Sequence, residues 1–497
     1  MTRRLAAIGG VAALGRWVGV LAIAGALTGC AMLEQQGEKL APGAPSAPPS
    51  APRTVGVDAL TTAEHKKLVA QFGGEYRWPS AEAYLNNILV KLAAASDVPT
   101  TPYRVTILNT PVVNAFALPS GNLYVSRGLL ELANDSSEVA AVMAHEIGHV
   151  TARHASARAE REKQAALIAE AATVIQSRQK GEEVETNQRL SFASFSRQQE
   201  IEADKIGVNV IARAGFDPFG AARFLTSLGR STALRAELLG QKSPDKPDIL
   251  ATHPATPERI AQATQAARQL GAPGVGASDR AGYLASIDGM NFGEDPSDGL
   301  VRGRRFFQPR LRFSFTAPDA FVLDNTARAL LGRAGGGSEA LRLDSVPEPA
   351  GQTLEAYLAS GWLDGLLASS IQSGEVNGLP AVFGLARAGE WNFRVAVVRK
   401  DGDLYRLLFA ARAMDDATIR KFDQSIQSLR PLTAEEAAKV RPQKLEIVKA
   451  GFGENADGMA RRMATPDKPL ETFLLLNGLA PGASLKFGEA YKVVVDQ

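Results

Sequence analysis

The hydrophobic and polar positions follow different periods in different parts of the chain. From 57 to 270 the apolar residues recur mostly at helical spacing, and only 103–126 shows short strand-like runs. From 305 to 432, helices alternate with runs of period two, at 311–316, 391–398 and 404–409, and an amphipathic helix is expected at 415–429. The pattern predicts a multidomain protein, in which a mostly helical domain with a small β-sheet precedes an α+β module.

The final segment, 444–497, predicts the order strand, helix, helix, strand. Its pieces include Ile447-Val-Lys-Ala-Gly451, Phe473-Leu-Leu-Leu-Asn477 and Tyr491-Lys-Val-Val-Val495, and together they resemble a divergent LysM module. Such modules bind N-acetylglucosamine polymers, so the resemblance implies a peptidoglycan contact through 444–497. The chain departs from the pattern at Gly451-Phe452-Gly453, where these modules usually carry Gly-Asp-Thr.

The segment 271–304 is rich in Gly, Asp and Ser, and we expect it to be a linker. No helical repeat with a period near 34 residues follows the helical domain. The module at 305–432 carries no chemical motif of its own. Two roles therefore stay open for it, substrate or partner binding and structural support.

Residues 1–29 predict a signal peptide, because arginines precede an apolar run at 18–27 that is too short to span a bilayer. The run ends in Leu27-Thr-Gly-Cys30, which resembles the lipobox of bacterial lipoproteins. That resemblance implies a lipid on Cys30 and a membrane contact through it. The alternatives are an ordinary signal peptide with a chance cysteine, or a membrane anchor.

Residues 30–56 are expected to form a tether after the lipidated cysteine. Five prolines among small residues cannot build a core and favour an extended chain. The residue after Cys30 is Ala31 and not Asp. The lipoprotein resemblance then implies the periplasmic face of the outer membrane, in preference to the inner membrane.

The composition narrows the chemistry that the chain can perform. The formal net charge is only +2, so a nucleic-acid partner is not expected. The single cysteine excludes an intrachain disulfide and a cysteine-rich zinc site. Any metal must therefore be held by nitrogen and oxygen, and three of the five histidines, His145, His149 and His154, lie close together.

The segment His145-Glu146-Ile147-Gly148-His149 is an HExxH motif. On a helix, residues four apart share a face, so both imidazoles can reach one zinc ion while Glu146 serves as general base. Asp135-Ser-Ser-Glu138 resembles a capping box and predicts where this helix begins. The alternative is a surface helix with two stray histidines, but Met143 and Ile147 predict a buried helix.

Catalytic zinc needs a third protein ligand. Glu200 and Asp204 are again four residues apart on a second expected helix, while Glu202 points away from their shared face. Glu200 can bind the metal, and Asp204 can accept a hydrogen bond from a ligand imidazole. Without the HExxH motif, this acidic turn would be read as a solvated helix face.

HExxH followed by Glu-x-x-Ala-Asp on a later helix resembles metallopeptidase family forty-eight, which includes HtpX, the CAAX prenyl endopeptidases and BepA-like enzymes. The resemblance covers roughly 57–270 and implies a zincin-like (gluzincin) zinc endopeptidase of the soluble, BepA-like branch. It implies one Zn²⁺ per chain, held by His145, His149 and Glu200, with Glu146 as general base and Asp204 behind the ligands. Family analogy adds quality control of misfolded or misassembled envelope proteins as the expected role.

Two further segments match the family. The segment with Asn114, Phe116, Pro119 and Gly121 reads as a short β-element, a turn and a strand that offers an edge to an extended substrate. His253, in Thr-His-Pro-Ala-Thr-Pro, is a further metal-reaching group, and we hypothesise that it blocks the open zinc position until a substrate displaces it. The alternative is a structural histidine that caps a helix.

The remaining candidates are weaker. His154 is expected near the ligands or at the surface, and His65 is expected in solvent. Arg197 and Arg259 are candidates for stabilising the oxyanion. Two alternative functions stay open, an outer-membrane assembly chaperone and a peptidoglycan-associated adaptor, each with a latent metal site.

Overall fold

The computed structural model describes residues 65–158, 160, 195–238, 253 and 255–496, except 67, 71, 326–328, 335–336 and 466. The expected signal peptide, Cys30 and the tether lie outside these residues. All the described residues belong to one compact unit, residues 56–497. None of the described helices combines the length and hydrophobicity that crossing a bilayer requires.

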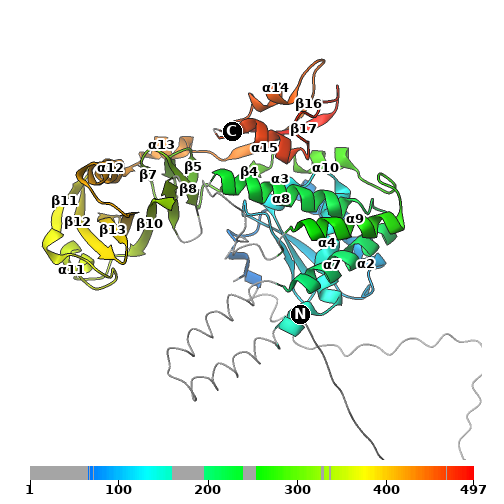
Figure 1. Cartoon of the computed structure of the whole chain (residues 1–497), viewed down its shortest axis with the longest axis horizontal. Helices are drawn as coiled ribbons and strands as arrows, with labels where there is room; N and C mark the ends of the chain where they lie inside the picture. The colour runs from blue at the N-terminus through cyan, green and yellow to red at the C-terminus, as the bar shows by residue number, and fades with distance from the viewer. Residues whose placement is uncertain are drawn as a thin grey trace, which may run out of the picture. The chain divides into compact units, whose positions relative to one another are not determined.

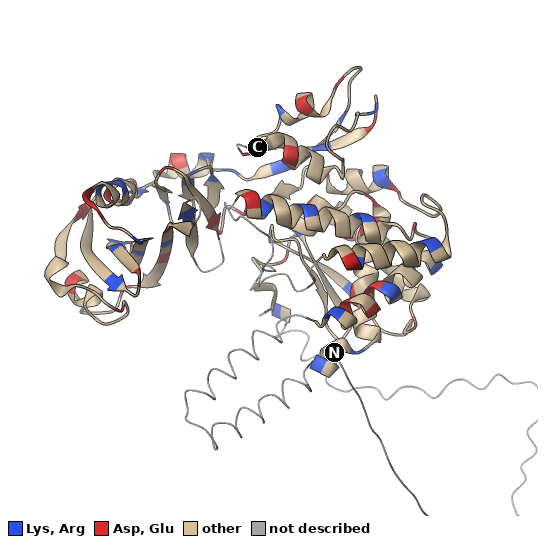
Figure 2. Cartoon of the chain, in the orientation of Figure 1, with Lys and Arg blue, Asp and Glu red and all other residues tan. Residues whose placement is uncertain are grey.

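Long helices make up most of the described chain between residues 79 and 270. Their bounds are α2 (Pro79–Ala95), α4 (Ser136–Thr151), α7 (Arg197–Arg213), α8 (Gly220–Leu238) and α9 (Pro257–Leu270), with the shorter α3 (Arg127–Leu132) before α4. Helices α4, α7, α8 and α9 lie side by side (Figure 1). Acidic and basic residues are interspersed along them (Figure 2), in keeping with the near-zero net charge.

Two glycines let α4 and α7 approach closely. A Cβ atom on Gly148 would lie 3.0 Å from the Ala203 carbonyl oxygen, and one on Gly207 would lie 3.0 Å from the His145 backbone nitrogen. Both contacts are tighter than ordinary van der Waals packing. The missing side chains therefore bring the two motif-bearing helices together.

The small sheet predicted at 103–126 is present. Its strands are β1 (Arg104–Leu108), β2 (Ala115–Ala117) and β3 (Asn122–Ser126), in the order β1-β3-β2. Strand β3 pairs in parallel with β1 and antiparallel with β2. Strand β2 is thus an edge strand, and it contacts the HExxH helix α4.

The segment 271–304 is not a linker, contrary to the expectation. It contains α10 (Arg280–Ile287), β4 (Asn291–Phe292) and β5 (Leu300–Arg302). Tyr283, Ile287 and Met290 are at most 1% exposed in the same apolar core as α2 and α4. The linker prediction relied on the Gly, Asp and Ser residues of this segment. It overlooked the apolar residues that recur at helical spacing in this short helix.

Residues 300–431 are richer in strands than an alternating α+β pattern suggests. The period-two runs at 311–316, 391–398 and 404–409 are confirmed as strands β7, β13 and β14, and the amphipathic helix is confirmed as α12. One sheet has the order β11-β12-β13-β14-β10-β9-β8 and the other β15-β7-β6-β5. The bounds are β6 (Arg305–Gln308), β7 (Phe313–Thr316), β8 (Phe321–Asn325), β9 (Leu330–Ala334), β10 (Glu339–Pro347), α11 (Leu354–Leu358), η2 (Ala368–Ser370), β11 (Gln372–Val376), β12 (Leu379–Ala388), β13 (Trp391–Lys400), β14 (Asp403–Ala411), α12 (Asp416–Ile426) and β15 (Arg430–Pro431).

The C-terminal segment has the predicted strand–helix–helix–strand order. After α13 (Ala434–Lys439) come β16 (Gln443–Lys449), α14 (Ala456–Ala460), α15 (Pro469–Leu476) and β17 (Ala490–Asp496). The antiparallel pair β16–β17 is extended by β4, which belongs to the segment expected as a linker. Phe473 and Val493 share one apolar cluster with Leu85 and Leu130, so this segment completes the core of the helical part.

Lys492 makes a second, polar connection between these parts. Its side chain is fully buried, and Nζ donates hydrogen bonds to the carbonyl oxygens of Glu131 (2.8 Å) and Ala133 (2.7 Å) at the end of α3. Burial holds the pKa of this amine well below its usual value. The carbonyls bonded to Lys492 lie directly before the start of the HExxH helix.

Candidate metal centre

Helix α4 begins where its first residues predict. The side chain of Asp135 accepts hydrogen bonds from the backbone nitrogens of Ser137 (2.9 Å) and Glu138 (3.0 Å), which are otherwise unpartnered in the first turn. The helix then carries His145 and His149 one turn apart, 8% and 4% exposed. The motif therefore lies on a buried helix and not on a surface helix with stray histidines.

Helix α7 supplies the carboxylates. Ser196 and Gln199 form a reciprocal capping box at its first turn. Glu200 and Asp204 follow on one face, 1% and 8% exposed, while the Glu202 side chain is 53% exposed. The predicted division between an inward-facing pair and an outward-facing Glu202 is thus observed.

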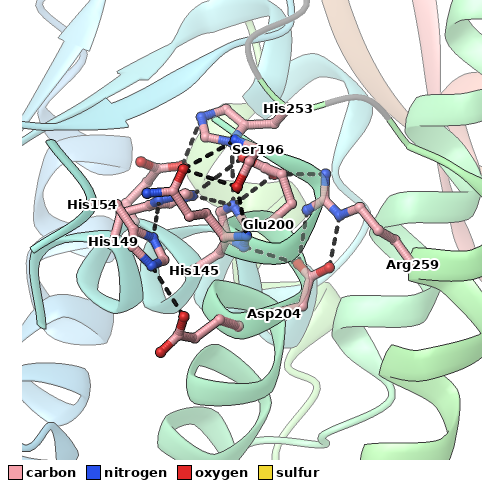
Figure 3. A network of polar contacts seen from close by, with 11 residues as sticks. His145, His149, His154, Ser196, Glu200, Asp204, His253 and Arg259 are labelled. Atoms are coloured by element: carbon pink, nitrogen blue, oxygen red, sulfur yellow. Dashed lines mark hydrogen bonds and ion pairs between the residues drawn. The ribbon is translucent and has the colours of Figure 1, made fainter. Parts of the chain in front are cut away.

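The ligand atoms of four residues converge. One nitrogen or oxygen from each of His145, His149, Glu200 and His253 lies within 4.8 Å of the others (Figure 3). The two α4 imidazoles face each other with 3.0 Å between their Nε2 atoms, and each lies 3.5 Å from a Glu200 oxygen. Imidazole nitrogens that converge beside a carboxylate can bind a cation. A set of histidines with one carboxylate is typical of catalytic zinc.

Asp204 and Arg259 support these ligands from behind. Oδ1 of Asp204 lies 2.9 Å from Nδ1 of His145, a hydrogen bond that fixes which ring nitrogen is directed at the metal. Arg259, 3% exposed, donates to Asp204 from Nε (2.7 Å) and lies 2.8 Å from Glu200 through Nη1. Arg259 therefore positions the two carboxylates, which is a different role from the oxyanion contact expected from the sequence.

His154 and Phe195 hold the second imidazole. Nδ1 of His154 lies 2.9 Å from Nδ1 of His149, and His154 is 3% exposed. Of the two expectations for His154, the position near the ligands is thus the observed one. The Phe195 ring stacks on His149, with centroids 4.0 Å apart. The sequence offered no sign of the Phe195 contact, except that this aromatic residue directly precedes the cap of α7.

Glu146 lies where a general base is needed. It is 2% exposed, and its Oε1 is 3.6 Å from Nε2 of His253. Burial raises the pKa of Glu146, while His253, His145 and a backbone hydrogen bond from Ala117 oppose that rise. The bond to Ala117 connects this carboxyl group with the edge strand β2.

The electrostatics of the ligands favour a bound cation. Burial lowers the pKa of His149, and neighbouring His145 and His253 lower it further, which favours the neutral imidazole that metal binding requires. Burial also lowers the pKa of His145, but hydrogen bonds to Asp204 and Glu200 outweigh it and raise the pKa to about 10. The carboxylate groups around the cluster thus stabilise positive charge at its centre.

The four residues predicted for the substrate-binding edge lie in and around the β2–β3 hairpin and make different contacts there. Asn114 precedes β2, and its carbonyl accepts from the Ser126 nitrogen at 2.9 Å. The Phe116 ring stacks on Tyr124, with centroids 4.8 Å apart. Pro119 is exposed in the β2–β3 turn, where Gly121 has φ +90° and a Cβ atom would meet Thr101 at 2.9 Å. These residues shape the hairpin that presents the β2 edge.

The other candidates lie in different places. His253, with a side chain 14% exposed, is 2.9 Å from Glu200. The cap of α9 is Thr256 and not His253. His65 is half-buried against the Tyr124 hydroxyl at 2.9 Å, so the expected solvent position is wrong. Arg197 has a 70% exposed side chain and pairs with Glu258.

Comparison with known proteins agrees with this geometry. The family model described as Peptidase family M48 matches residues 79–267. "Beta-barrel assembly-enhancing protease" of Escherichia coli (strain K12) is 34% identical over 219 residues, 42% of this chain and 43% of that protein. "Mitochondrial metalloendopeptidase OMA1" of Arabidopsis thaliana is 35% identical over 175 residues, 35% of this chain and 33% of that protein.

"Metalloprotease LoiP" of Escherichia coli (strain K12) is 27% identical over 223 residues, 42% of this chain and 83% of that protein. The similarity to the beta-barrel assembly-enhancing protease spans less than half of that protein's own length. The matched region contains the whole His145–Glu146–His149 motif, Glu200, Asp204, His253 and Arg259. Residues 79–267 are therefore similar to Peptidase family M48, and within them His145, His149 and Glu200 form the cluster that fits a zinc site.

Proposed function

We propose that this protein is an endopeptidase of the bacterial envelope that hydrolyses misfolded or misassembled periplasmic and outer-membrane proteins. The observation that carries the proposal is the buried convergence of His145, His149 and Glu200 beside Glu146. An inactive scaffold has no need for a buried carboxyl group in that position. The names of the relatives from Escherichia coli, a beta-barrel assembly-enhancing protease and a metalloprotease, support the substrate class.

The chain supplies binding, orientation and proton transfer. Zinc, when bound, would polarise the scissile carbonyl and lower the pKa of the water that attacks it. Glu146 accepts the proton of the attacking water and transfers it to the leaving amine. Strand β2 aligns the substrate as an added strand, because its outer edge pairs with no other strand that the structure describes. Asp204 and Arg259 keep the ligands in place.

We further propose that His253 regulates access to the metal. Its Nδ1 belongs to the same converging cluster as the three ligands, so it can occupy the position that water and substrate need. The finding that Thr256 caps α9 supports this role over a capping role for His253. His253→Ala is expected to increase cleavage of unfolded protein at unchanged zinc content, whereas unchanged cleavage contradicts the proposal.

We place the protein at the periplasmic face of the outer membrane, held by a lipid on Cys30. The lipobox-like Leu27-Thr-Gly-Cys30 and the following Ala31 support this location. Labelling of cells with a radioactive fatty acid tests it. Label is expected in the wild-type protein and not in Cys30→Ser, and sucrose-gradient separation of the two membranes then tests the sorting.

A peptidoglycan-associated role is the second candidate, and the C-terminal segment favours it. Phe452 and Phe487 are 95% and 75% exposed, and their ring centroids are 6.4 Å apart. Exposed aromatic rings suit stacking against sugar rings. Sedimentation with insoluble peptidoglycan is expected to capture the wild-type chain and to lose the variant Phe452→Ser/Phe487→Ser. Equal capture of both contradicts this role.

The peptidase proposal itself is tested with purified, zinc-loaded residues 31–497 and an unfolded outer-membrane protein. We expect the substrate to disappear with the wild-type chain and to persist with Glu146→Gln at equal zinc content. Equal loss in both samples contradicts the proposal. Persistence in both, together with suppressed aggregation of the substrate, would instead indicate an assembly chaperone.

A further inference from the structure

The two imidazoles that α4 directs at the metal centre are supported in different ways. Nδ1 of His145 lies 2.9 Å from Oδ1 of Asp204, a buried carboxylate. At Nδ1 of His149 the structure places a third imidazole, because Nδ1 of His154 lies 2.9 Å away (Figure 3). The contacts continue beyond this imidazole, since Nε2 of His154 lies 3.4 Å from Oε2 of Glu202. A line of polar contacts thus leads from the metal centre to a side chain that the proposed function does not use.

The atom of His149 that faces the metal determines where the protons of this line must lie. Nε2 of His149 lies 3.0 Å from Nε2 of His145 and 3.5 Å from Glu200, so Nε2 needs a free lone pair to bind the metal. A neutral His149 then carries its proton on Nδ1 and donates it to Nδ1 of His154. Because His154 accepts at Nδ1, it carries its own proton on Nε2 and donates it to the Glu202 carboxylate. One arrangement of protons therefore satisfies every contact in the line.

The backbone turns after α4 to bring His154 back to the ligands. On an uninterrupted helix, a residue five positions after His149 would point away from the face that carries both ligands. Helix α4 ends at Thr151, and Arg153 adopts φ +54°, a left-handed conformation that residues other than glycine seldom take. This break in the helix lets the next residue, His154, face the cluster with its side chain 4% exposed.

Burial changes along the line from the metal centre to the surface. The side chains of His149 and His154 are 5% and 4% exposed, whereas that of Glu202 is 53% exposed. The Glu202 carboxylate therefore stays in contact with water while it binds a buried ring, and its charge does not have to be desolvated. Phe195 stacks on the face of His149 and leaves the Nδ1 edge to His154. A buried imidazole with a partner at each nitrogen is suited to fixing an orientation and a tautomer.

We propose that His154 and Glu202 are positioning residues of the metal centre, and that together they fix the tautomer and orientation in which His149 binds zinc. His154 accepts the Nδ1 proton of His149, and Glu202 keeps His154 in the tautomer that can accept it. The inference rests on the zinc-binding part of the proposed function and is independent of the substrate. It gives Glu202, which points away from the face of Glu200 and Asp204, an indirect role in zinc binding.

Two variants of similar shape test the role of His154. Asn and Leu side chains are nearly isosteric, but Oδ1 of Asn can replace the accepting Nδ1 of the imidazole, whereas Leu offers no acceptor. In chelator competition with purified residues 31–497, His154→Leu is expected to weaken zinc binding at least about tenfold, and His154→Asn to stay within about threefold of the wild type. Equal affinities of the two variants overturn the proposal, because both leave the same space and only one retains the hydrogen bond.

Glu202 is tested at the surface, where a substitution leaves the buried packing intact. Glu202→Ala is expected to weaken zinc binding about three- to tenfold in the wild type and to have no effect in His154→Asn, because an amide has no tautomer to fix. Glu160→Ala removes another exposed glutamate from the segment after His154 and is the matched control, with the zinc affinity of the wild type expected. If Glu202→Ala behaves like Glu160→Ala, or weakens zinc binding equally in both backgrounds, the line through His154 does not operate.

A spectroscopic measurement distinguishes a positioned ligand from a site that is only stable. Cobalt(II) replaces zinc in each variant, and the Nδ1 protons of cobalt-bound imidazoles give shifted proton resonances that vanish in heavy water. We expect one such resonance each from His145 and His149 in the wild type and in His154→Asn. In His154→Leu one of the two is expected to disappear, because the Nδ1 proton of His149 loses its buried partner and exchanges with water. Persistence of both resonances in His154→Leu overturns the proposal, while the peptidase function stands, because no substrate takes part in the measurement.

Discussion

At the scale of single residues, the sequence predicted the metal ligands but not the groups that hold them. His145 and His149 can be found from spacing alone, because a helix fixes the geometry of residues four apart. Arg259 and Phe195 touch the same cluster from segments far away in the sequence. No local spacing encodes such contacts, which depend on how helices pack.

Asp204→Asn is expected to weaken zinc binding about 10- to 100-fold, because Asn is a poorer partner for His145 and Arg259. A chelator competition assay measures the zinc affinity. Lys205→Gln, an exposed position on the same helix, is the control. Equal affinities for the two variants would show that Asp204 does not orient His145.

Glu294 gives a pH-dependent prediction. Burial raises the pKa of this carboxyl group to about 7, although its hydrogen bond from the Val301 nitrogen opposes the rise. The neutral form is thus favoured in the folded state, and its stabilising effect is complete below about pH 4.5 and lost as the pH rises through 7. The free energy of unfolding of Glu294→Gln should therefore rise by up to about 3 kcal/mol relative to that of the wild type as the pH increases from 4.5 to 8.

Urea unfolding at the two pH values measures this difference. Glu436→Gln, a carboxyl group with a lowered pKa at the surface, serves as the control and is not expected to gain stability as the pH rises. A constant difference between Glu294→Gln and wild type would refute the prediction.

At the scale of elements, the site depends on the close approach of α4 and α7. Periodicity in the sequence predicted both helices and their inward faces. It did not predict their packing, in which Gly148 and Gly207 leave room for the neighbouring backbone. The short helix α10 was missed for a related reason, since the composition of 271–304 outweighed four apolar positions.

Gly207→Ala is expected to push α7 away from α4, because the new methyl group would lie 3.0 Å from the His145 nitrogen. We expect a loss of about 1–3 kcal/mol in the free energy of unfolding, together with weaker zinc binding. Gly229→Ala on α8 is the matched control, since its nearest neighbours are 3.9 Å away. That variant should be neutral or stabilised by up to about 1 kcal/mol.

Thermal unfolding and chelator competition provide the two measurements. Both glycine substitutions reduce backbone freedom in the same way, so only the approach of α4 distinguishes them. If both variants behaved alike, the close helix contact would not control the metal site.

At the scale of the whole molecule, the C-terminal segment is part of the peptidase core. The order of its elements could be predicted from the sequence, because strands and helices have distinct periods. Its packing against α3 and its sheet with β4 could not, because those contacts join residues far apart in the chain. Removal of 443–497 is therefore expected to unfold the peptidase domain as well, and point variants are the sounder probes of this segment.

Lys492→Met is expected to lower the free energy of unfolding by about 1–3 kcal/mol, because buried carbonyl groups at the end of α3 lose their donor. Chemical denaturation measures the loss, and Lys486→Met, with a side chain 77% exposed, is the control. Unchanged stability of Lys492→Met would indicate that other donors satisfy these carbonyls.

The position of Lys492 also has a consequence for when the metal site is completed during synthesis. Chains are synthesised from the N-terminus, and His149 precedes Lys492 by 492 − 149 = 343 residues. The metal ligands thus emerge long before the strand that completes their scaffold. We expect a nascent chain to hold an incomplete metal site until β17 has docked.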